Sequence, residues 1–320
     1  MPFAKRKTFL LCAVSLTTLA SVASIVPLTS ERRANRRLFE TTPQQSAALT
    51  TATTEEVRVA AIAPPAETPA TASTFVPEAA RRNGALKDEL RWTFGGKGQR
   101  GWALYVPLIQ HLLGTDEGAA SSNFAASLAR WQNRAGLAAS GVLDEATLMK
   151  MIATWQARRL KSRIYPQPDQ LLTVSPEEFY DSSRAEELRQ VERQTYAAYK
   201  RMLAAATRES SLQLATRAEG ELAANEKYLK IISAFRSREY QERLRKLEPG
   251  AGRAALAVNS PHFTGRALDI YVGGEPVETR DSNRALQTQT PVYRWLVRNA
   301  ERFGFCPYFY EPWHWEYCAP

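Results

Sequence analysis

The sequence predicts an α+β protein in which a small three-helix domain precedes a small antiparallel sheet with helices packed on one side. Two segments near the C-terminus carry the strand signal. Residues 267–272 place Leu268, Ile270 and Val272 on one face and Asp269 on the other, as in a half-buried strand, and the aromatic-rich run 313–317 also alternates. The segments before them show apolar residues at helical spacing, interrupted by proline and glycine.

The chain begins with the pattern of an export signal over residues 1–23. Lys5-Arg-Lys7 precedes an apolar run that ends in the small-x-small motif Ser21-Val-Ala23. The run contains threonine and serine and is weakly apolar for a permanent span, so cleavage and retention as an uncleaved anchor both stay open. In either case we expect an exported protein of the periplasm or cell envelope. It touches a membrane only through this segment, and only if the segment stays uncleaved.

Residues 24–89 are rich in Thr, Ala and Pro and contain few aromatic or large aliphatic side chains. Such a segment cannot bury enough surface to offset the conformational entropy lost on ordering. We therefore expect a disordered tether that ends at residue 89.

Residues 90–155 are predicted to form the small helical domain. Helices are expected at 108–113 and 124–131, and Asp144 is a suitable N-cap for a third. The order of these elements resembles the three-helix peptidoglycan-binding domain, but the Asp-Gly-x-Phe-Gly loop usual in that domain is not recognisable. A wall-binding module and a packing domain without ligand both stay open, and His111 is expected to be a packing or surface residue.

Residues 156–184 are interpreted as a linker before the sheet-containing domain at 185–320. Tyr165-Pro-Gln-Pro-Asp169 breaks a basic helical run, and Ser175-Pro-Glu-Glu178 is typical of a helix start. The apolar stripe that follows, up to Leu203, predicts a long helix lying across the sheet. A strand is expected at 231–235 and a charged helix at 237–247.

Two short segments hold two of the three histidines of the chain, and each places a histidine near a carboxylate. They are Ser260-Pro-His-Phe-Thr-Gly-Arg-Ala-Leu-Asp269 and Glu311-Pro-Trp-His314. Two imidazoles and a carboxylate can bind a tetrahedral metal ion and leave its fourth position to water. Imidazole ligands favour zinc over magnesium or calcium, but they do not decide between zinc and other transition metals. The predicted ligands are therefore His262, Asp269 and His314, and the predicted cofactor is Zn²⁺.

The motif Ser-x-His-x-x-Gly-x-Ala-x-Asp followed by Glu-x-Trp-His resembles the VanY-type D-alanyl-D-alanine carboxypeptidases. These are zinc peptidases that trim peptidoglycan stems on the fold shared by DD-peptidases and hedgehog proteins. Phe235-Arg-Ser-Arg-Glu-Tyr-Gln241 is similar to an upstream Arg-Ser-x-x-x-Gln segment of the same family. The three blocks occur in the order of the family.

A metal-bound water needs a general base, and position alone leaves Glu311 and Glu316 as candidates. The resemblance implies Glu311 as the base and leaves Glu316 as a partner of a metal ligand. Arg236 offers paired donors for an oxyanion or a substrate carboxylate. The resemblance also implies that Gln241 and Ser260 contact substrate, whereas a surface helix position and a turn cap are the alternatives.

Cys306 and Cys318 bracket Glu311 and His314 in the sequence. In an exported protein we expect them to form a disulfide that fixes the strand carrying His314, worth on the order of 3 kcal/mol. A thiolate metal ligand is the alternative. Trp313 and Trp315 are expected to be core residues.

The predicted function is zinc-dependent hydrolysis of a peptide bond in peptidoglycan stem peptides, with release of a terminal D-alanine. Alternatives are an endopeptidase or L,D-carboxypeptidase on the same fold, a non-catalytic wall-binding envelope protein, and an envelope tether whose zinc only holds the fold. The net charge of +9 suits an anionic partner such as a carboxylate-rich stem. No nucleic-acid recognition motif or compact basic stripe is present, and the sequence carries no signal of oligomeric state.

Overall fold

The computed structural model describes residues 69–218, 220–247 and 259–319, with side chains from Val76 onward. The predicted signal segment and most of the predicted tether therefore lie outside the described residues. No helix within these ranges has both the length and the apolar character that a membrane span requires.

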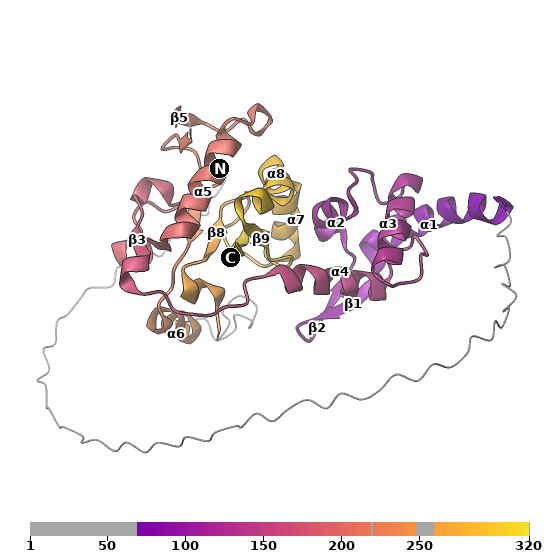
Figure 1. Cartoon of the computed structure of the whole chain (residues 1–320), viewed down its shortest axis with the longest axis horizontal. Coiled ribbons are helices and arrows are strands. Elements are labelled where there is room, and N and C mark those ends of the chain that lie inside the picture. The colour runs from indigo at the N-terminus through magenta and orange to yellow at the C-terminus, as the bar shows by residue number, and fades with distance from the viewer. Residues whose placement is uncertain (1–68, 219, 248–258, 320) are drawn as a thin grey trace, which may run out of the picture. The chain divides into compact units, whose positions relative to one another are not determined.

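The N-terminal part of the described chain contains four helices and one β-hairpin (Figure 1). The last three helices were predicted, whereas the first helix and the hairpin were not. Its elements are α1 (Pro69–Glu89), β1 (Arg91–Phe94), β2 (Lys97–Arg100), α2 (Val106–Leu113), α3 (Ser122–Arg134) and α4 (Glu145–Arg158). Asp144 caps α4 as expected, because its Oδ1 accepts a hydrogen bond from the Thr147 amide at 2.8 Å. His111 lies on α2 with an exposed side chain, as expected.

Residues 69–89 form helix α1, so the prediction that a disordered tether extends to residue 89 is wrong. Ala79 and Ala80 are buried where α1 packs on α3. Asn83 is fully buried; its Nδ2 donates to Gly141 O at 2.8 Å and its Oδ1 accepts from Leu143 N at 2.7 Å. Small side chains let the two helices approach closely, so α1 packs without the large apolar residues on which the prediction relied.

The C-terminal part contains the predicted small antiparallel sheet, which has four strands in the order β7-β8-β10-β9. These strands are β7 (Ile231–Ser233), β8 (Ala267–Ile270), β9 (Phe305–Pro307) and β10 (His314–Tyr317). The helices around them are α5 (Arg193–Thr207), α6 (Arg238–Leu247), α7 (Asp281–Gln289) and α8 (Pro291–Asn299) (Figure 1). Two short ribbons complete the part, β3 (Leu171–Thr173) with β4 (Gln190–Glu192) and β5 (Thr216–Ala218) with β6 (Glu221–Leu222).

All residues of β8 and β10 are buried, so the prediction of a half-buried strand is wrong. Trp315 lies opposite Leu268 and packs on Tyr293 of α8, with ring centroids 6.4 Å apart. The alternation of side chains puts Asp269 and His314 on the other face of the two strands. The face that carries Asp269 and His314 is therefore a buried polar surface and not a solvated one.

The long helix expected after Ser175 begins later than predicted. Ser175 caps only a short 3₁₀ turn, Pro176–Glu178, through its Oγ and the Glu177 amide. Helix α5 starts at Arg193, where the carboxylate of Glu192 caps the first turn. Strand β4 intervenes because Val191 is fully buried and pairs with Leu172 of β3. The predicted linker 156–184 thus holds a strand that pairs with the first strand of the following domain.

Cys306 on β9 and Cys318 just after β10 carry free thiols, so the structure does not contain the expected disulfide. The two residues are nevertheless close. Cys306 pairs with Glu316, and the Cys318 amide donates to Gly304 O at 2.8 Å, which places the cysteines diagonally on neighbouring strands. A hydrogen bond from the Cys318 thiol lowers the pKa of Cys306.

We expect these two thiols to form a disulfide on oxidation and to stabilise the fold by on the order of 3 kcal/mol. The melting temperature should therefore fall when the oxidised protein is reduced, and Cys318→Ser should remove this dependence and weaken metal retention. Titration of free thiols in the denatured protein before and after reduction shows whether the disulfide has formed. Equal melting temperatures in both redox states would contradict the prediction.

Candidate metal centre

His262, Asp269 and His314 come together at one buried point, where their donor atoms all lie within 4.8 Å of one another. Among the described residues, no other set of three or more His, Cys, Asp or Glu side chains is grouped in this way. His262 lies on the 3₁₀ turn Pro261–Thr264, Asp269 on β8, and His314 opens β10 directly opposite Asp269. The register of two neighbouring strands therefore joins residues 45 positions apart in the sequence.

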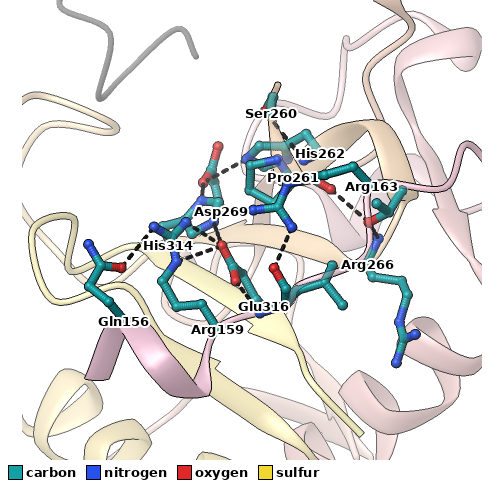
Figure 2. Close-up of polar contacts among 12 residues, drawn as sticks. Gln156, Arg159, Arg163, Ser260, Pro261, His262, Arg266, Asp269, His314 and Glu316 are labelled. Atoms are coloured by element: carbon teal, nitrogen blue, oxygen red, sulfur yellow. Dashed lines mark hydrogen bonds and ion pairs between the residues drawn. The ribbon is translucent and has the colours of Figure 1, made fainter. Parts of the chain in front are cut away.

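The separations of the three side chains match a tetrahedral ion. Asp269 Oδ1 lies 3.3 Å from His262 Nε2 and 3.0 Å from His314 Nδ1 (Figure 2). Ligands bound to zinc at about 2.0–2.1 Å in tetrahedral directions are about 3.3 Å apart. The two distances to Asp269 therefore match zinc ligands, and all three donor atoms lie within 4.8 Å of one another.

Hydrogen bonds on the far side of each ring select the nitrogen that faces the metal position. His262 Nδ1 lies 2.7 Å from the carbonyl oxygen of Ala234, which can only accept, so Nδ1 carries the hydrogen. His314 Nε2 lies 3.2 Å from Glu316 Oε1 and donates in the same way. His262 Nε2 and His314 Nδ1 are the nitrogens turned toward Asp269 and the metal position.

The turn that carries His262 depends on its flanking residues. Ser260 Oγ accepts a hydrogen bond from the His262 amide at 3.3 Å, which is the turn-capping role considered for this serine. Gly265 ends the turn with φ +67°, and a Cβ there would meet the backbone nitrogen of Glu192 at 3.0 Å. A larger residue at 265 would therefore displace the entry into β8.

Arg236 is nearly buried and holds the second oxygen of Asp269, with Nη2 2.6 Å from Oδ2. Its Nε donates to Ser233 Oγ at 2.9 Å, and Nη1 lies 3.5 Å from Gln241 Oε1. Gln241 is almost fully buried, so the alternative of a surface helix position is wrong. Burial alone would raise the pKa of Asp269, but His262, His314 and Arg236 together hold it well below its usual value.

The two histidines carry different charges. Burial and the neighbouring Arg236 lower the pKa of His262 to about 4, so its imidazole is neutral at neutral pH, as a metal ligand must be. Burial also lowers the pKa of His314, but hydrogen bonds to Asp269 and Glu316 outweigh it and raise the pKa to about 9. A metal ion at His314 Nδ1 must therefore displace a proton.

The surroundings of Glu311 and Glu316 separate the two candidate bases. Glu311 is buried, and its Oε1 has no hydrogen-bond partner among the described residues. Burial raises the pKa of Glu311 to about 7. Glu316 instead accepts hydrogen bonds from His314, Arg159 and the Leu160 amide, and burial is outweighed by these partners, which lower its pKa to about 2. Of the two candidates, only Glu311 has a carboxylate oxygen without a hydrogen-bond partner among the described residues.

Sequence reasoning missed Arg159, which lies 157 positions before its partner Glu316. It belongs to a basic run that gave no sign of a buried contact. Trp313 and Trp315 are both buried, which agrees with the expected core role.

Residues 188–320 match the family model described as VanY, D-alanyl-D-alanine carboxypeptidase. The resemblance drawn from the motifs is therefore confirmed for this part of the chain. Among solved structures, the chain is similar to the LdcB LD-carboxypeptidase, with a TM-score of 0.34 and 23% identity, over 49% of this chain and 72% of that one. No curated protein matches the chain.

Proposed function

We propose that the protein hydrolyses a peptide bond in peptidoglycan stem peptides and releases the terminal D-alanine, with zinc held by His262, Asp269 and His314. The observation that carries the proposal is the buried set of three metal donors beside a carboxylate, Glu311, whose Oε1 has no partner among the described residues. The family match of residues 188–320 supports a peptidase of the cell wall. Its substrate would lie outside the cytoplasm, in the periplasm or cell envelope.

Zinc bound here would lower the pKa of a water molecule to about 7 and polarise the scissile carbonyl. Glu311 accepts the proton of the attacking water through Oε1 and then passes it to the leaving amine. A carboxylate with a pKa of about 7 suits both steps, because it can hold or release a proton near neutral pH. Glu316 keeps the ring of His314 in place and takes no part in the proton transfer.

Arg236 provides the positive charge beside the reacting carbonyl. Two of its nitrogens are used by Asp269 and Ser233, while Nη1 makes only the 3.5 Å contact with Gln241 within the described residues. We assign Nη1 to the oxyanion or to the terminal carboxylate of the substrate. Gln241 beside it and Ser260 at the edge of the His262 turn are the proposed substrate contacts.

Incubation of the purified chain with defined muropeptides, read by mass spectrometry, tests this proposal. We expect a pentapeptide stem to lose one alanine, a chelator to reduce the rate to background, and added zinc to restore it. Loss of the fourth residue would instead indicate an L,D-carboxypeptidase, and cleavage of a cross-link an endopeptidase. Zinc binding without any product would overturn the proposed enzyme in favour of a wall-binding or tethering protein.

A further inference from the structure

We infer that Arg159, just after α4, is a positioning residue of the metal centre, which holds Glu316 and through it fixes the ring of His314. The inference rests on the proposed function only in taking His314 as a metal ligand. It also assigns a role to the N-terminal helical region, namely to support the active site from outside the part of the chain that matches the carboxypeptidase family.

The contacts of Glu316 come from the segment that leaves α4. Arg159 Nε donates to Glu316 Oε1 at 2.9 Å, and Nη2 is in contact with the same oxygen. The Leu160 amide donates to Oε2 at 2.8 Å. Both oxygens of a carboxylate that is completely buried are thus satisfied by two consecutive residues. Without them the charge would be buried with a single partner, which is costly.

The guanidinium of Arg159 is itself fixed. Its Cζ lies 3.9 Å from the ring centroid of Tyr308, and Nη1 donates to Gln156 Oε1 at 3.2 Å. The same Tyr308 ring meets His314 edge-on, with centroids 5.9 Å apart. A planar group stacked on an aromatic ring and forked onto a carboxylate cannot be replaced by a lysine ammonium without loss of geometry.

Glu316, held by Arg159, in turn fixes the orientation of the His314 ring at the metal position. Its Oε1 accepts from His314 Nε2 at 3.2 Å, and this hydrogen bond keeps Nδ1 turned toward Asp269 and the metal position. Hydrogen-bond partners of this kind orient a metal-binding histidine, and their removal typically costs roughly 10–100-fold in metal affinity. Arg159 acts one step further out, by keeping Glu316 aimed at the ring.

The N-terminal region also packs on the loop before Glu311. The ring of Phe94 in β1 meets Phe309 and Tyr310 with centroids 4.8 Å and 5.3 Å away. Trp155 of α4 stacks on Phe309 at 6.1 Å. The loop that leads to the proposed base and the strand that carries His314 are therefore both held by residues that precede the family match, which begins at residue 188.

The zinc affinity of Arg159→Gln, measured by competition with a chromophoric chelator on the full chain, tests the inference. We expect roughly 10-fold weaker binding, a smaller loss for Arg159→Lys, and no change for the matched control Arg158→Gln. Arg158 is adjacent, but its ion pair with Glu301 is exposed on both sides. In a Glu316→Gln background, Arg159→Gln should add little, because the residue through which it acts is already altered.

Unchanged zinc affinity in Arg159→Gln would overturn the inference, as would the same loss with and without Glu316→Gln. If Arg159→Gln does not fold, as judged by circular dichroism, Arg159→Lys keeps the charge and carries the test with the same criteria. Because affinity is measured without substrate, a wild-type protein that binds zinc but cleaves no muropeptide would defeat the proposed function and leave this inference standing.

Discussion

Replacement of Glu311 by alanine or glutamine is expected to lower the rate of stem-peptide cleavage by roughly 10²–10⁴-fold while zinc stays bound. Glu311 is not one of the three grouped donors, so its loss leaves the metal position intact. Its Oε1 is buried without a partner among the described residues, so its removal breaks no hydrogen bond of the fold. The measurement is the turnover of a defined muropeptide together with the zinc content of the variant.

The exposed Glu301 offers a matched control, because its carboxylate forms an exposed ion pair with Arg158 and has no part in the proposed proton transfer, so Glu301→Gln should leave turnover unchanged. A Glu311→Gln enzyme as active as the wild type would show that another group accepts the proton. Zinc lost together with activity would instead give Glu311 a structural role.

The pH dependence of the cleavage rate should report the ionisation of Glu311. A general base must be ionised before it accepts a proton, so activity rises with pH through the pKa of Glu311. Burial places that pKa at about 7, and the positive charge of a bound metal lowers it, so the acidic limb is expected at or below pH 7. The residual activity of Glu311→Gln should lack this limb.

The local part of the site could be predicted because each motif is short. The spacing from His262 to Asp269 and from Glu311 to His314 puts each pair on a turn and the strand that follows it. Their meeting depends on the pairing of β8 with β10, which the alternation of each strand only made plausible. The choice between Glu311 and Glu316 needed the resemblance, and the structure adds the physical reason, since only Glu316 is already paired.

The support around the site could not be predicted, because its contacts have no spacing signature. Arg159 looks like any other arginine of a solvated helix end until Glu316, far along the chain, is placed beside it. Helix α1 escaped prediction for a related reason, since two alanines and the buried Asn83 anchor it in place of large apolar side chains. The burial of both faces of β8 and β10 could not be predicted either. Polar residues such as Asp269 and His314 normally mark the solvated face of a strand, but at a functional site they can lie on a buried face.

Loss of His314 is expected to abolish metal binding and to destabilise the metal-free fold, whereas loss of His262 should mainly abolish metal binding. His314 lies between two buried carboxylates, 3.0 Å from Asp269 and 3.2 Å from Glu316, while the ring nitrogens of His262 face one carboxylate, Asp269, and a carbonyl oxygen. Removing one member of a buried ion pair typically costs about 3–5 kcal/mol. We therefore expect His314→Ala to lower the free energy of unfolding more than His262→Ala does, with the exposed His111→Ala as a control that changes neither stability nor zinc affinity.

The stabilisation of the metal-free fold by His314 should depend on pH. Because the pKa of His314 is raised to about 9 in the folded metal-free protein, its contribution to stability is fully present below the unfolded pKa of about 6.5. That contribution is lost as the pH rises through 9. Chemical denaturation of chelator-treated protein should thus show the largest gap between wild type and His314→Ala below pH 6.5 and a smaller one at pH 9. A gap that widens with pH, or zinc affinity retained in His314→Ala, would remove His314 from the centre of the site.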